Sequence, residues 1–402
     1  MSVKKSLLIT YPAMMIGGST TSLLSILNRL DYDKYEVDLL LNSHTGELLD
    51  MIPPQVNLLP PALRYTDRKK EYLRRLLSPY YMFHYIRSKA IANKSGVPIH
   101  AAQYLEWKDA EFFRKIDKEY DVAVAFLEGD RCKFTARHVK AKRKVAWIHI
   151  NYKDSRFNPE YDRDTMCAFD NIVLVSEDCK RDFDELFPEL ADRTLVIENI
   201  LASEYVRQRA KEGTGIEVDG NTVNLVTHCR ISFKHKGLDR AVSALARLKA
   251  EGLLPDAGHP LHWYIIGDGG DRPELERLVA EAGLDDYITL LGMKKNPYPY
   301  LPKMTLYFQP SRWEGKPMAV TEAFMLGLPV LATEYSSARE QIRGGVDGII
   351  VANSEEGIYE GLKRVILQPE IIPVLKANVD ATDYSNTEEI QAVQTLFDGD
   401  GE

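Results

Sequence analysis

Long apolar runs and paired cysteines are both missing from this chain of 402 residues. No segment approaches the roughly 18 consecutive apolar residues that a membrane-spanning helix needs. Met1 to Lys5 lead directly into the strand-like SLLIT, without the layout of a signal peptide. These absences lead us to expect a cytosolic protein.

Cysteine is scarce, and its spacing has no pattern. The four residues are Cys132, Cys167, Cys179 and Cys229, and no two form a CxxC motif. This argues against a disulfide framework and against a zinc site, so buried free thiols are expected. The acidic triplets DRD (162–164) and DFD (182–184) do not follow a strand end with a glycine-rich approach. We interpret both as surface acids of helices rather than as metal ligands.

What is present is an ordinary globular composition, with 45% apolar and 27% charged residues. A chain of 402 residues is longer than one hydrophobic core usually grows, so two domains are expected. The formal net charge of -8 disfavours nucleic acid as a partner.

Apolar segments that alternate with helical segments fill the first 200 residues. KKSLLITYPA predicts a first strand, and GGSTTSLLSILNRL predicts a glycine loop that opens a helix. Further strands are expected at YEVDLLLN, DVAVAFL, RKVAWIHI, NIVLVS and TLVIEN. Strands separated by helices predict a parallel sheet with helices on both faces.

The same alternation restarts after residues 201–222, which are polar and glycine-rich and which we interpret as a linker. The sequence therefore predicts two doubly wound α/β domains, residues 1–200 and 201–378, with a ligand in a cleft between them at the carboxyl ends of the strands. Residues 379–402 are expected to form a last helix and a tail. This segment is expected to pack on one of the two domains, and packing back on the N-terminal domain is one of the alternatives. Ser385 or Asn386 is expected to cap this helix.

One segment combines basic and aromatic residues. Residues 64–94 contain nine Lys or Arg against two acids, interleaved with tyrosines and Phe83. Such a mixture suits an anionic lipid surface, an anionic substrate or a solvated helix face, and the sequence leaves these alternatives open.

Two carboxylates eight positions apart, Glu314 and Glu322, lie in SRWEGKPMAVTEAFMLGLPVLATEY, residues 311–335. LYFQPS predicts a strand before them, Pro317 suits the first position of a helix and Gly327 suits its end. Glu314 is then expected in a loop and Glu322 inside the helix. The free amides at the helix start, those of Met318, Ala319 and Val320, attract oxyanions. The layout favours a binding site over an acid–base pair.

This stretch resembles the E-x7-E signature of the retaining glycosyltransferases of family 4, which have the GT-B fold of two Rossmann-like domains facing a cleft. HCRISFKHKGLDRAV is similar to the phosphate-binding element of that family, and WYIIGDGGDRPELERLVAEAGLDDYITLLG resembles the strand–helix–strand that follows it. GGSTTSLLSILNRL resembles the N-terminal Gly-Gly loop, and WIHINY places His149 where the family has an active-site histidine. The likeness extends over most of the chain.

The resemblance implies a role for each matching residue. Arg230 and Lys236 would neutralise the donor diphosphate, and Glu322 would accept hydrogen bonds from the ribose hydroxyls. Glu314 and the amides of residues 318–320 would bind the transferred sugar, and His149 would bind the sugar or the acceptor. Met293 would contact the nucleobase, and Gly17 and Gly18 would allow the backbone to approach the donor closely. No metal and no cofactor are expected, because fixed cations and amide dipoles can stabilise the leaving group.

Two departures from the family pattern are visible. Lys316, Pro317 and Met318 replace the common aromatic–glycine pair after E-G, and residues 199–202 read NILA in place of N-G-V-D. Roles without any function in binding also stay open at this point. Glu314, Glu322, Arg230 and Lys236 are then solvated charges, and His149 is a core residue or a capping residue.

We therefore predict a retaining hexosyltransferase of family 4 that moves a hexose from a nucleotide diphosphate sugar to a hydroxyl of a glycan or lipid-linked acceptor. A UDP-sugar is favoured, and cell-surface polysaccharide synthesis is the expected process. The alternatives are an epimerase or phosphorylase on the same fold, and a non-catalytic nucleotide- or glycan-binding protein. A nicotinamide oxidoreductase is disfavoured because GDGG at 267–270 lacks the dinucleotide fingerprint. The expected location is cytoplasmic, peripheral on the inner face of the plasma membrane.

Overall fold

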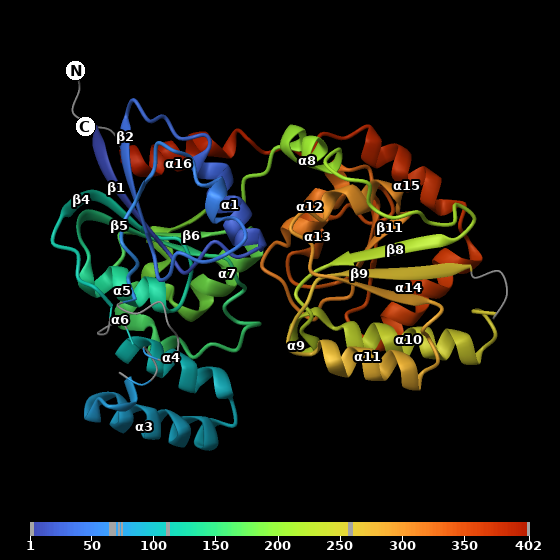
Figure 1. The fold of residues 1–402 in the computed structure, drawn as a ribbon, viewed down its shortest axis with the longest axis horizontal. Helices are drawn as coiled ribbons and strands as arrows, with labels where there is room; N and C mark the ends of the chain where they lie inside the picture. Colours follow the sequence, from blue (N-terminus) through green and yellow to red (C-terminus); the bar gives the residue numbers. More distant parts are fainter. Residues whose placement is uncertain are drawn as a thin grey trace. The chain divides into compact units, whose positions relative to one another are not determined.

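The computed structural model describes residues 4–63, 70, 73, 75–109, 113–255 and 260–399. The chain divides into two compact units: the N-terminal unit (Met1–Ile200 with Glu388–Glu402) and the C-terminal unit (Leu201–Thr387). Each unit has a parallel sheet covered by helices, as Figure 1 shows. The predicted α/β class with two Rossmann-like, doubly wound domains is confirmed.

Seven parallel strands form the sheet of the N-terminal unit, in the order β3-β2-β1-β4-β5-β6-β7. Leu7 of β1 pairs with Val37 of β2 on one side and with Val122 of β4 on the other. The strand order reverses at β1, so the carboxyl ends of β1 and β4 form a switch point of the kind where α/β proteins bind ligands. The strands are β1 Lys5–Tyr11, β2 Tyr35–Leu41, β3 Asn57–Leu58, β4 Glu119–Ala125, β5 Lys140–Ile148, β6 Asn171–Leu174 and β7 Thr194–Val196.

Helices connect these strands, as the apolar periodicity predicts. The first, α1 Gly18–Leu27, follows β1 and buries Leu23, Leu24, Ile26 and Leu27 against the sheet. The other α-helices of the unit are α3 Pro79–Ser95, α4 Pro98–Asp109, α5 Asp130–His138, α6 Arg163–Met166, α7 Glu177–Leu186 and α16 Glu389–Asp398, and the 3-10 helices are η1 Leu49–Met51, η3 Pro159–Tyr161 and η4 Pro188–Arg193.

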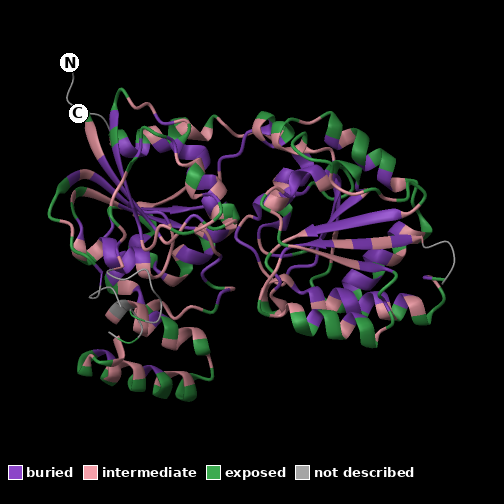
Figure 2. Cartoon of the chain, viewed as in Figure 1, coloured by how far each residue is buried: buried purple, intermediate pink, exposed green. Residues whose placement is uncertain are grey.

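Six parallel strands form the sheet of the C-terminal unit, in the order β10-β9-β8-β11-β12-β13. They are β8 Val223–His228, β9 Leu261–Ile266, β10 Ile288–Gly292, β11 Leu306–Gln309, β12 Val330–Thr333 and β13 Gly348–Val351. All four residues of β11 are buried, and Figure 2 shows burial along the central strands. Alternate residues face opposite cores, since Leu306 and Phe308 pack in one apolar cluster and Tyr307 in the other. Burial on both faces explains the continuous apolar runs in the sequence.

Two layers of helices cover this second sheet. In Figure 1, α10, α11 and α14 lie on one face, and α8, α12, α13 and α15 lie on the other. The helices are α8 Ser203–Ala210, α9 Phe233–Lys236, α10 Leu238–Ala250, α11 Arg272–Glu281, η5 Tyr298–Lys303, α12 Met318–Met325, α13 Ala338–Gln341, α14 Glu355–Leu367 and α15 Ile371–Asp380.

Residues 201–222 are not a simple linker, and that interpretation was wrong. They contain α8, whose Val206 is fully buried beside Tyr298 and Met325. Arg207 also donates a hydrogen bond to the backbone oxygen of Met325 at 3.1 Å. Too few apolar residues are present for a helical period to stand out, and contacts with residues far along the chain hold the helix in place.

The C-terminal segment divides between the units. Residues up to Thr387 belong to the C-terminal unit, and α16 packs in the core of the N-terminal unit through Val393 and Phe397. Neither Ser385 nor Asn386 caps this helix, because its N-cap is Glu388. The Asn386 side-chain oxygen instead accepts a hydrogen bond from the Leu201 amide at 2.9 Å.

Two further expectations were wrong in part. Cys167 is exposed, whereas Cys132 and Cys179 are buried. The two triplets do not consist of surface acids alone, since Asp162 and Asp182 are buried. Asp162 accepts a hydrogen bond from Gln103 at 2.6 Å, and Asp182 accepts one from Asn151 at 2.8 Å. Short polar motifs carry no information about which residue of the three faces the core.

Residues 64–69, 71–72 and 74 of the basic, aromatic segment lie outside the described residues. Most of its remainder forms α3, which pairs with α4 as a helical hairpin. None of the helices in the described ranges is both long and apolar enough to span a bilayer.

Candidate functional site

The loop between β11 and α12, residues 310–317, lies at the carboxyl edge of the second sheet and is attached from several sides. Arg312 makes two hydrogen bonds of 2.7 Å to the carboxylate of Asp239, on α10. Arg240, also on α10, donates to the Pro310 backbone oxygen at 3.1 Å. The β8–α10 segment therefore positions the loop that carries Glu314.

Gly237, between α9 and α10, makes this close approach possible. Its φ of +64° lies in the left-handed region, which side chains other than glycine rarely adopt. A Cβ atom built on it would lie 2.3 Å from the Pro310 backbone oxygen. Only glycine can both adopt this φ and leave room for the Pro310 oxygen. The segment that carries Lys236 can therefore lie directly against the backbone of Pro310.

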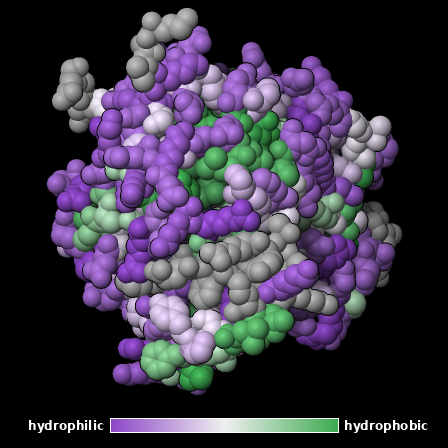
Figure 3. All heavy atoms as spheres, turned by 60° about the vertical axis from the view of Figure 1, so that its left-hand side comes forward, coloured by the Kyte–Doolittle hydropathy of each residue, from purple (hydrophilic) through white to green (hydrophobic). Residues whose placement is uncertain are grey.

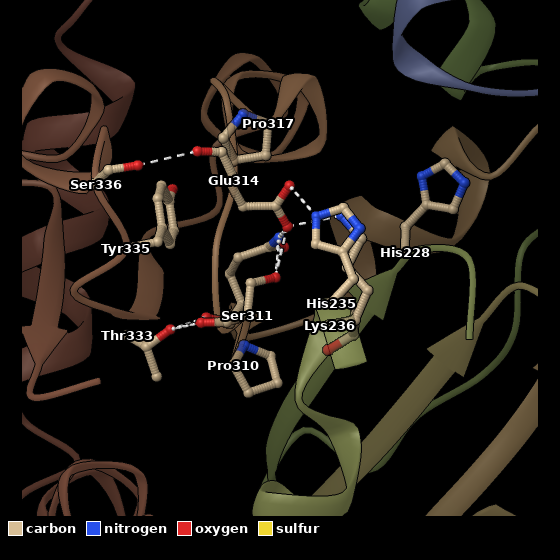
Figure 4. Close-up of polar contacts among 12 residues, drawn as sticks. His228, His235, Lys236, Pro310, Ser311, Glu314, Pro317, Thr333, Tyr335 and Ser336 are labelled. Atoms are coloured by element: carbon tan, nitrogen blue, oxygen red, sulfur yellow. Dashed lines mark hydrogen bonds and ion pairs between the residues drawn. The ribbon is translucent and has the colours of Figure 1, made fainter. Parts of the chain in front are cut away.

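The Glu314 carboxylate is the centre of the site (Figure 4). It is 5% exposed, and four side chains donate to it. Lys236 Nζ lies 2.6 Å from Oε1 and His235 Nε2 lies 3.2 Å from Oε2. Gln309 and Ser311 also donate to Oε1, at 2.7 and 2.5 Å. Two of these donors lie on α9, which follows β8, and the other two lie at and just after the end of β11, which is the strand next to β8.

Burial alone would raise the pKa of Glu314, but Lys236 and His235 outweigh it and keep that pKa well below its ordinary value. The carboxylate is therefore charged throughout the physiological range. A group that stays ionised cannot exchange protons, so its chemistry is that of a fixed hydrogen-bond acceptor.

The two predicted phosphate-binding cations differ in their surroundings. Lys236 is paired with Glu314 and has a side chain only 16% exposed. Arg230 follows β8 and is exposed, and its side chain forms no ion pair or hydrogen bond with the described residues. Both cations lie on the segment between β8 and α10, where the sheet order reverses.

Glu322, on the second turn of α12, has an environment opposite to that of Glu314. It is 5% exposed, accepts a hydrogen bond from Tyr298 Oη at 2.9 Å and has His228 Nδ1 at 3.9 Å. Burial raises the pKa of Glu322 to about 7, against the opposing effect of Tyr298. Burial, with help from Lys236, lowers the pKa of His228 to about 4, so that histidine is neutral at pH 7.

The start of α12 differs slightly from the expected arrangement. Pro317 is the N-cap rather than the first helical residue. The Val320 amide donates to the Pro317 backbone oxygen at 3.2 Å, so the expectation that it is free was wrong. Met318 and Ala319 begin the helix, where amides have no acceptor one turn earlier. Met293, predicted for the nucleobase, is 50% exposed after β10.

The remaining predicted residues lie in the N-terminal unit. His149 follows β5, and its ring contacts Phe126 with ring centres 4.9 Å apart. Burial lowers the pKa of His149 to about 3, although Asn199 opposes the shift, so the imidazole is neutral. Gly17 and Gly18 are exposed at the start of α1. Their roles and that of His149 stay predictions.

Several side chains around the carboxylates escaped the sequence reasoning. His235 stacks on Trp313 with ring centres 3.8 Å apart, and Gln309, Ser311 and Tyr298 complete the two carboxylate environments. Polar residues at the end of an otherwise apolar strand, as in LYFQPS, were the available signal for Gln309 and Ser311. Tyr298 has no such signal, because it lies in a short 3-10 helix. In the ranges that the structure describes, no cluster of three or more His, Cys, Asp or Glu could bind a metal ion.

The segment that carries these carboxylates matches a known family. Residues 222–368 match the family described as Glycosyl transferases group 1. The match lies within the C-terminal unit, and we call the matched residues the group 1 domain. This domain includes Arg230, Lys236, Glu314 and Glu322, whereas the N-terminal unit lies outside the match.

Curated relatives are similar over part of the chain. An uncharacterized glycosyltransferase of Methanocaldococcus jannaschii is 24% identical over 216 residues, which is 49% of this chain and 50% of the relative. The amylovoran biosynthesis glycosyltransferase AmsK of Erwinia amylovora is 30% identical over 168 residues, 39% of each chain. The chain thus spans half or less of the length of these relatives.

Solved structures are similar over nearly the whole chain. Anabaena HepE in complex with UDP-glucose superposes with a TM-score of 0.68 at 16% identity, over 98% of this chain and 99% of HepE. WaaG, a glycosyltransferase involved in lipopolysaccharide biosynthesis, gives a TM-score of 0.63 at 16% identity, over 98% and 100%. These neighbours have the GT-B fold, so the predicted fold of the group 1 domain and its partner unit is confirmed.

Proposed function

We propose that the protein is a retaining glycosyltransferase of family 4 that moves a hexose from a UDP-sugar to a hydroxyl of a glycan or lipid-linked acceptor. The process is cell-surface polysaccharide synthesis. The observation that carries the proposal is the ionised Glu314 carboxylate, which accepts hydrogen bonds from Lys236, His235, Gln309 and Ser311. It lies at the carboxyl edge of the sheet in the group 1 domain.

The donor assignment rests on the cations and carboxylates of this site, which suit different parts of a nucleotide sugar. A departing nucleoside diphosphate gains negative charge, and Arg230 and Lys236 neutralise that charge. Their common location on the segment between β8 and α10 supports this assignment. Glu314 accepts hydrogen bonds from sugar hydroxyls, and Glu322 accepts them from the ribose. HepE, solved with UDP and with UDP-glucose, supports a uridine nucleotide.

The acceptor assignment rests on the relatives. AmsK is named for amylovoran biosynthesis, and a Campylobacter jejuni relative that is 29% identical over 135 residues is named as a transferase to a sugar on diphospho-undecaprenol. A hydroxyl of a membrane-linked glycan is therefore the acceptor class that we propose for this chain.

The test begins with the thermal stability of the protein in the presence of UDP-, GDP- and ADP-sugars, in buffer with EDTA. A ligand at 100 times its Kd stabilises a protein by about 2.7 kcal/mol. We expect a UDP-sugar to raise the midpoint without added metal. Dependence on a divalent ion would contradict the metal-free donor site that we propose.

The second step measures UDP release with and without glycoside acceptors. Release that requires an acceptor supports transfer. Conversion of the UDP-sugar without release would indicate an epimerase, and binding without any turnover would indicate a nucleotide-binding protein.

We also propose that the surface of α3 contacts an anionic bilayer. Five of the ten exposed large apolar side chains in the described residues lie between residues 73 and 86: Leu73, Leu77, Tyr80, Phe83 and Ile86. Tyr80, Phe83 and Ile86 follow one another at intervals of three along the helix, and green side chains gather at the lower edge of Figure 3. The helix also carries three basic residues and no acid, as the anionic leaflet favours.

A further inference from the structure

The two oxygens of the Glu314 carboxylate differ in their hydrogen bonds. Lys236, Gln309 and Ser311 donate to Oε1, at 2.6, 2.7 and 2.5 Å. His235 Nε2 lies 3.2 Å from Oε2, as Figure 4 shows. A carboxylate oxygen has about two lone-pair sites, so Oε1 with these donors has no site left for a ligand. A sugar hydroxyl that binds Glu314 must therefore use Oε2, which is the oxygen that His235 contacts.

His235 contacts the loop of residues 310–317 through its backbone and through its ring. Its backbone oxygen accepts a hydrogen bond from the Arg312 amide at 2.8 Å. Its ring stacks on Trp313, with ring centres 3.8 Å apart and an angle of 14° between the planes. Because Glu314 is ionised, the nitrogen that faces it must carry a hydrogen. The stacked ring therefore directs a hydrogen-bond donor at Oε2.

Lys236 is less suited to fix the carboxylate during the proposed reaction. Under the proposed function it neutralises the diphosphate of the nucleotide sugar, so phosphate oxygens compete with Oε1 for its N–H groups. Its stem is also flexible, whereas the His235 ring is restricted by the stack on Trp313. His235 is then the hydrogen-bond donor that stays on Glu314 when the nucleotide sugar binds.

We propose that His235 is a positioning residue, which fixes Oε2 of Glu314 as the acceptor for one hydroxyl of the transferred sugar. The inference rests on the proposed function. It adds the atom that contacts the sugar and the side chain that orients this atom, and every group involved belongs to the C-terminal unit. A buried, ionised acceptor also discriminates between sugars, because a sugar without that hydroxyl leaves the acceptor unpaired.

The experiment measures by calorimetry the Kd for UDP and the Kd for the UDP-sugar that stabilises the protein most. The ratio of the two constants reports the contribution of the sugar, because the uridine and the diphosphate are common to both ligands. Wild type is compared with His235→Phe, whose ring can stack on Trp313 but cannot donate a hydrogen bond. It is also compared with His235→Gln, whose amide nitrogen can donate in place of Nε2.

The two variants should differ in their affinity for the sugar. His235→Phe should bind the UDP-sugar about tenfold more weakly, since it loses a hydrogen bond to a charged group, and should bind UDP within about twofold of wild type. His235→Gln should bind the UDP-sugar within about threefold of wild type. A residue that only supports the packing of the loop predicts the opposite order, because Phe is then the better replacement, and it predicts that both Kd values change together.

Deoxy analogues of the UDP-sugar identify the hydroxyl. The analogue that lacks the hydroxyl bound by Oε2 should bind wild type about tenfold more weakly, and His235→Phe should weaken its binding no further. Analogues that lack another hydroxyl should show the full effect of His235→Phe. The same effect of His235→Phe on every analogue overturns the inference, because the side chain then does not act through a single hydroxyl.

His262→Phe is the matched control. His262 lies in the same unit at the amino end of β9, with its ring centre 4.4 Å from that of Tyr264 and Nε2 2.8 Å from Thr289 Oγ1. This variant should bind UDP and the UDP-sugar as wild type does.

A ratio of Kd values for His235→Phe within about twofold of wild type overturns the inference. If His235→Phe does not fold, His235→Ala replaces it, and a wild-type ratio for His235→Ala overturns the inference in the same way. Failure of the wild type to bind UDP and every UDP-sugar overturns the proposed function instead.

Discussion

Glu314 and Glu322 have opposite protonation behaviour although they are eight residues apart in one motif. Glu314 is surrounded by two basic side chains and two neutral donors, whereas Glu322 has one tyrosine and a neutral histidine. The cations keep the pKa of Glu314 low, and burial raises that of Glu322 to about 7. The two side chains therefore serve different purposes.

Glu314→Gln should reduce turnover by about 100-fold or more, because a carboxamide offers one acceptor oxygen to four donors and leaves Lys236 without a partner. The Kd for UDP should change by less than about threefold. Glu322→Gln is the comparison, with the larger effect expected on UDP affinity. Calorimetry and steady-state UDP release measure both quantities, and equal effects of the two variants on turnover would contradict the assignment.

Glu322 should also make stability depend on pH. Its folded pKa is raised, so the native state binds a proton more tightly than the unfolded chain, and stability falls as the pH rises from about 4.5 to about 7. Glu322→Gln removes this effect. The variant should gain free energy of unfolding relative to wild type as the pH rises, by at most roughly 3 kcal/mol above pH 7. Urea unfolding at pH 4.5, 6 and 8 measures the difference, and a constant difference would count against the raised pKa.

At the scale of elements, the turn between α9 and α10 decides whether Lys236 reaches Glu314. Gly237→Ala should destabilise the C-terminal unit by more than about 2 kcal/mol, since left-handed backbone alone costs about 1–2 kcal/mol and the new Cβ meets Pro310. Gly252→Ala is the control, because its φ is +75° and its Cβ would meet nothing within 4 Å. Thermal unfolding should separate the two variants. Equal losses would show that the Pro310 contact is unimportant.

The α3 surface gives a second prediction at this scale. Phe83→Ser with Ile86→Ser should reduce partition onto vesicles with anionic phosphatidylglycerol by about tenfold, because both exposed side chains lose apolar area that can insert. Val374→Ser on α15, which is 61% exposed, is the matched control and should bind as wild type does. Sedimentation with anionic and with neutral vesicles measures the effect. Equal binding to both vesicle types would argue against a charge-assisted surface.

At the scale of the whole molecule, the chain returns to its first unit through α16. Phe397 is 1% exposed in the N-terminal core, Tyr35 Oη donates to Asp398 at 2.7 Å, and Arg143 donates to the Leu396 backbone oxygen at 2.7 Å. The last helix is therefore a structural part of the N-terminal unit. The Lys5 side chain donates a hydrogen bond to the Phe397 backbone oxygen, although the two residues are 392 positions apart in the sequence.

Phe397→Ala should destabilise the N-terminal unit by about 3–5 kcal/mol, the usual effect of removing a buried phenyl ring. Hydrogen exchange should increase in β1 and β2, while stabilisation of the group 1 domain by UDP should stay the same. Leu367→Ala, at a side chain 56% exposed, is the control. Loss of protection in the C-terminal unit as well would indicate that the units unfold together.

Most strands of the two sheets, the two-domain α/β organisation and the residues of the E-x7-E motif were accessible from the sequence alone. Apolar runs and helical periods are local properties, so the buried strands β1, β8 and β11 can be located by inspection. The failures have a common cause as well. Asp162, α8 and the cap of α16 depend on packing partners that lie far along the chain.

The sequence by itself determined which elements form and which residues follow the strand ends, because periodicity and turn chemistry act over a few residues. Only the tertiary structure decided how those residues behave. Lys236 reaches Glu314 across 78 positions and Tyr298 reaches Glu322 across 24. Burial and the donors that folding brings together set each pKa, so the ionised Glu314 and the titrating Glu322 emerge only in the folded chain.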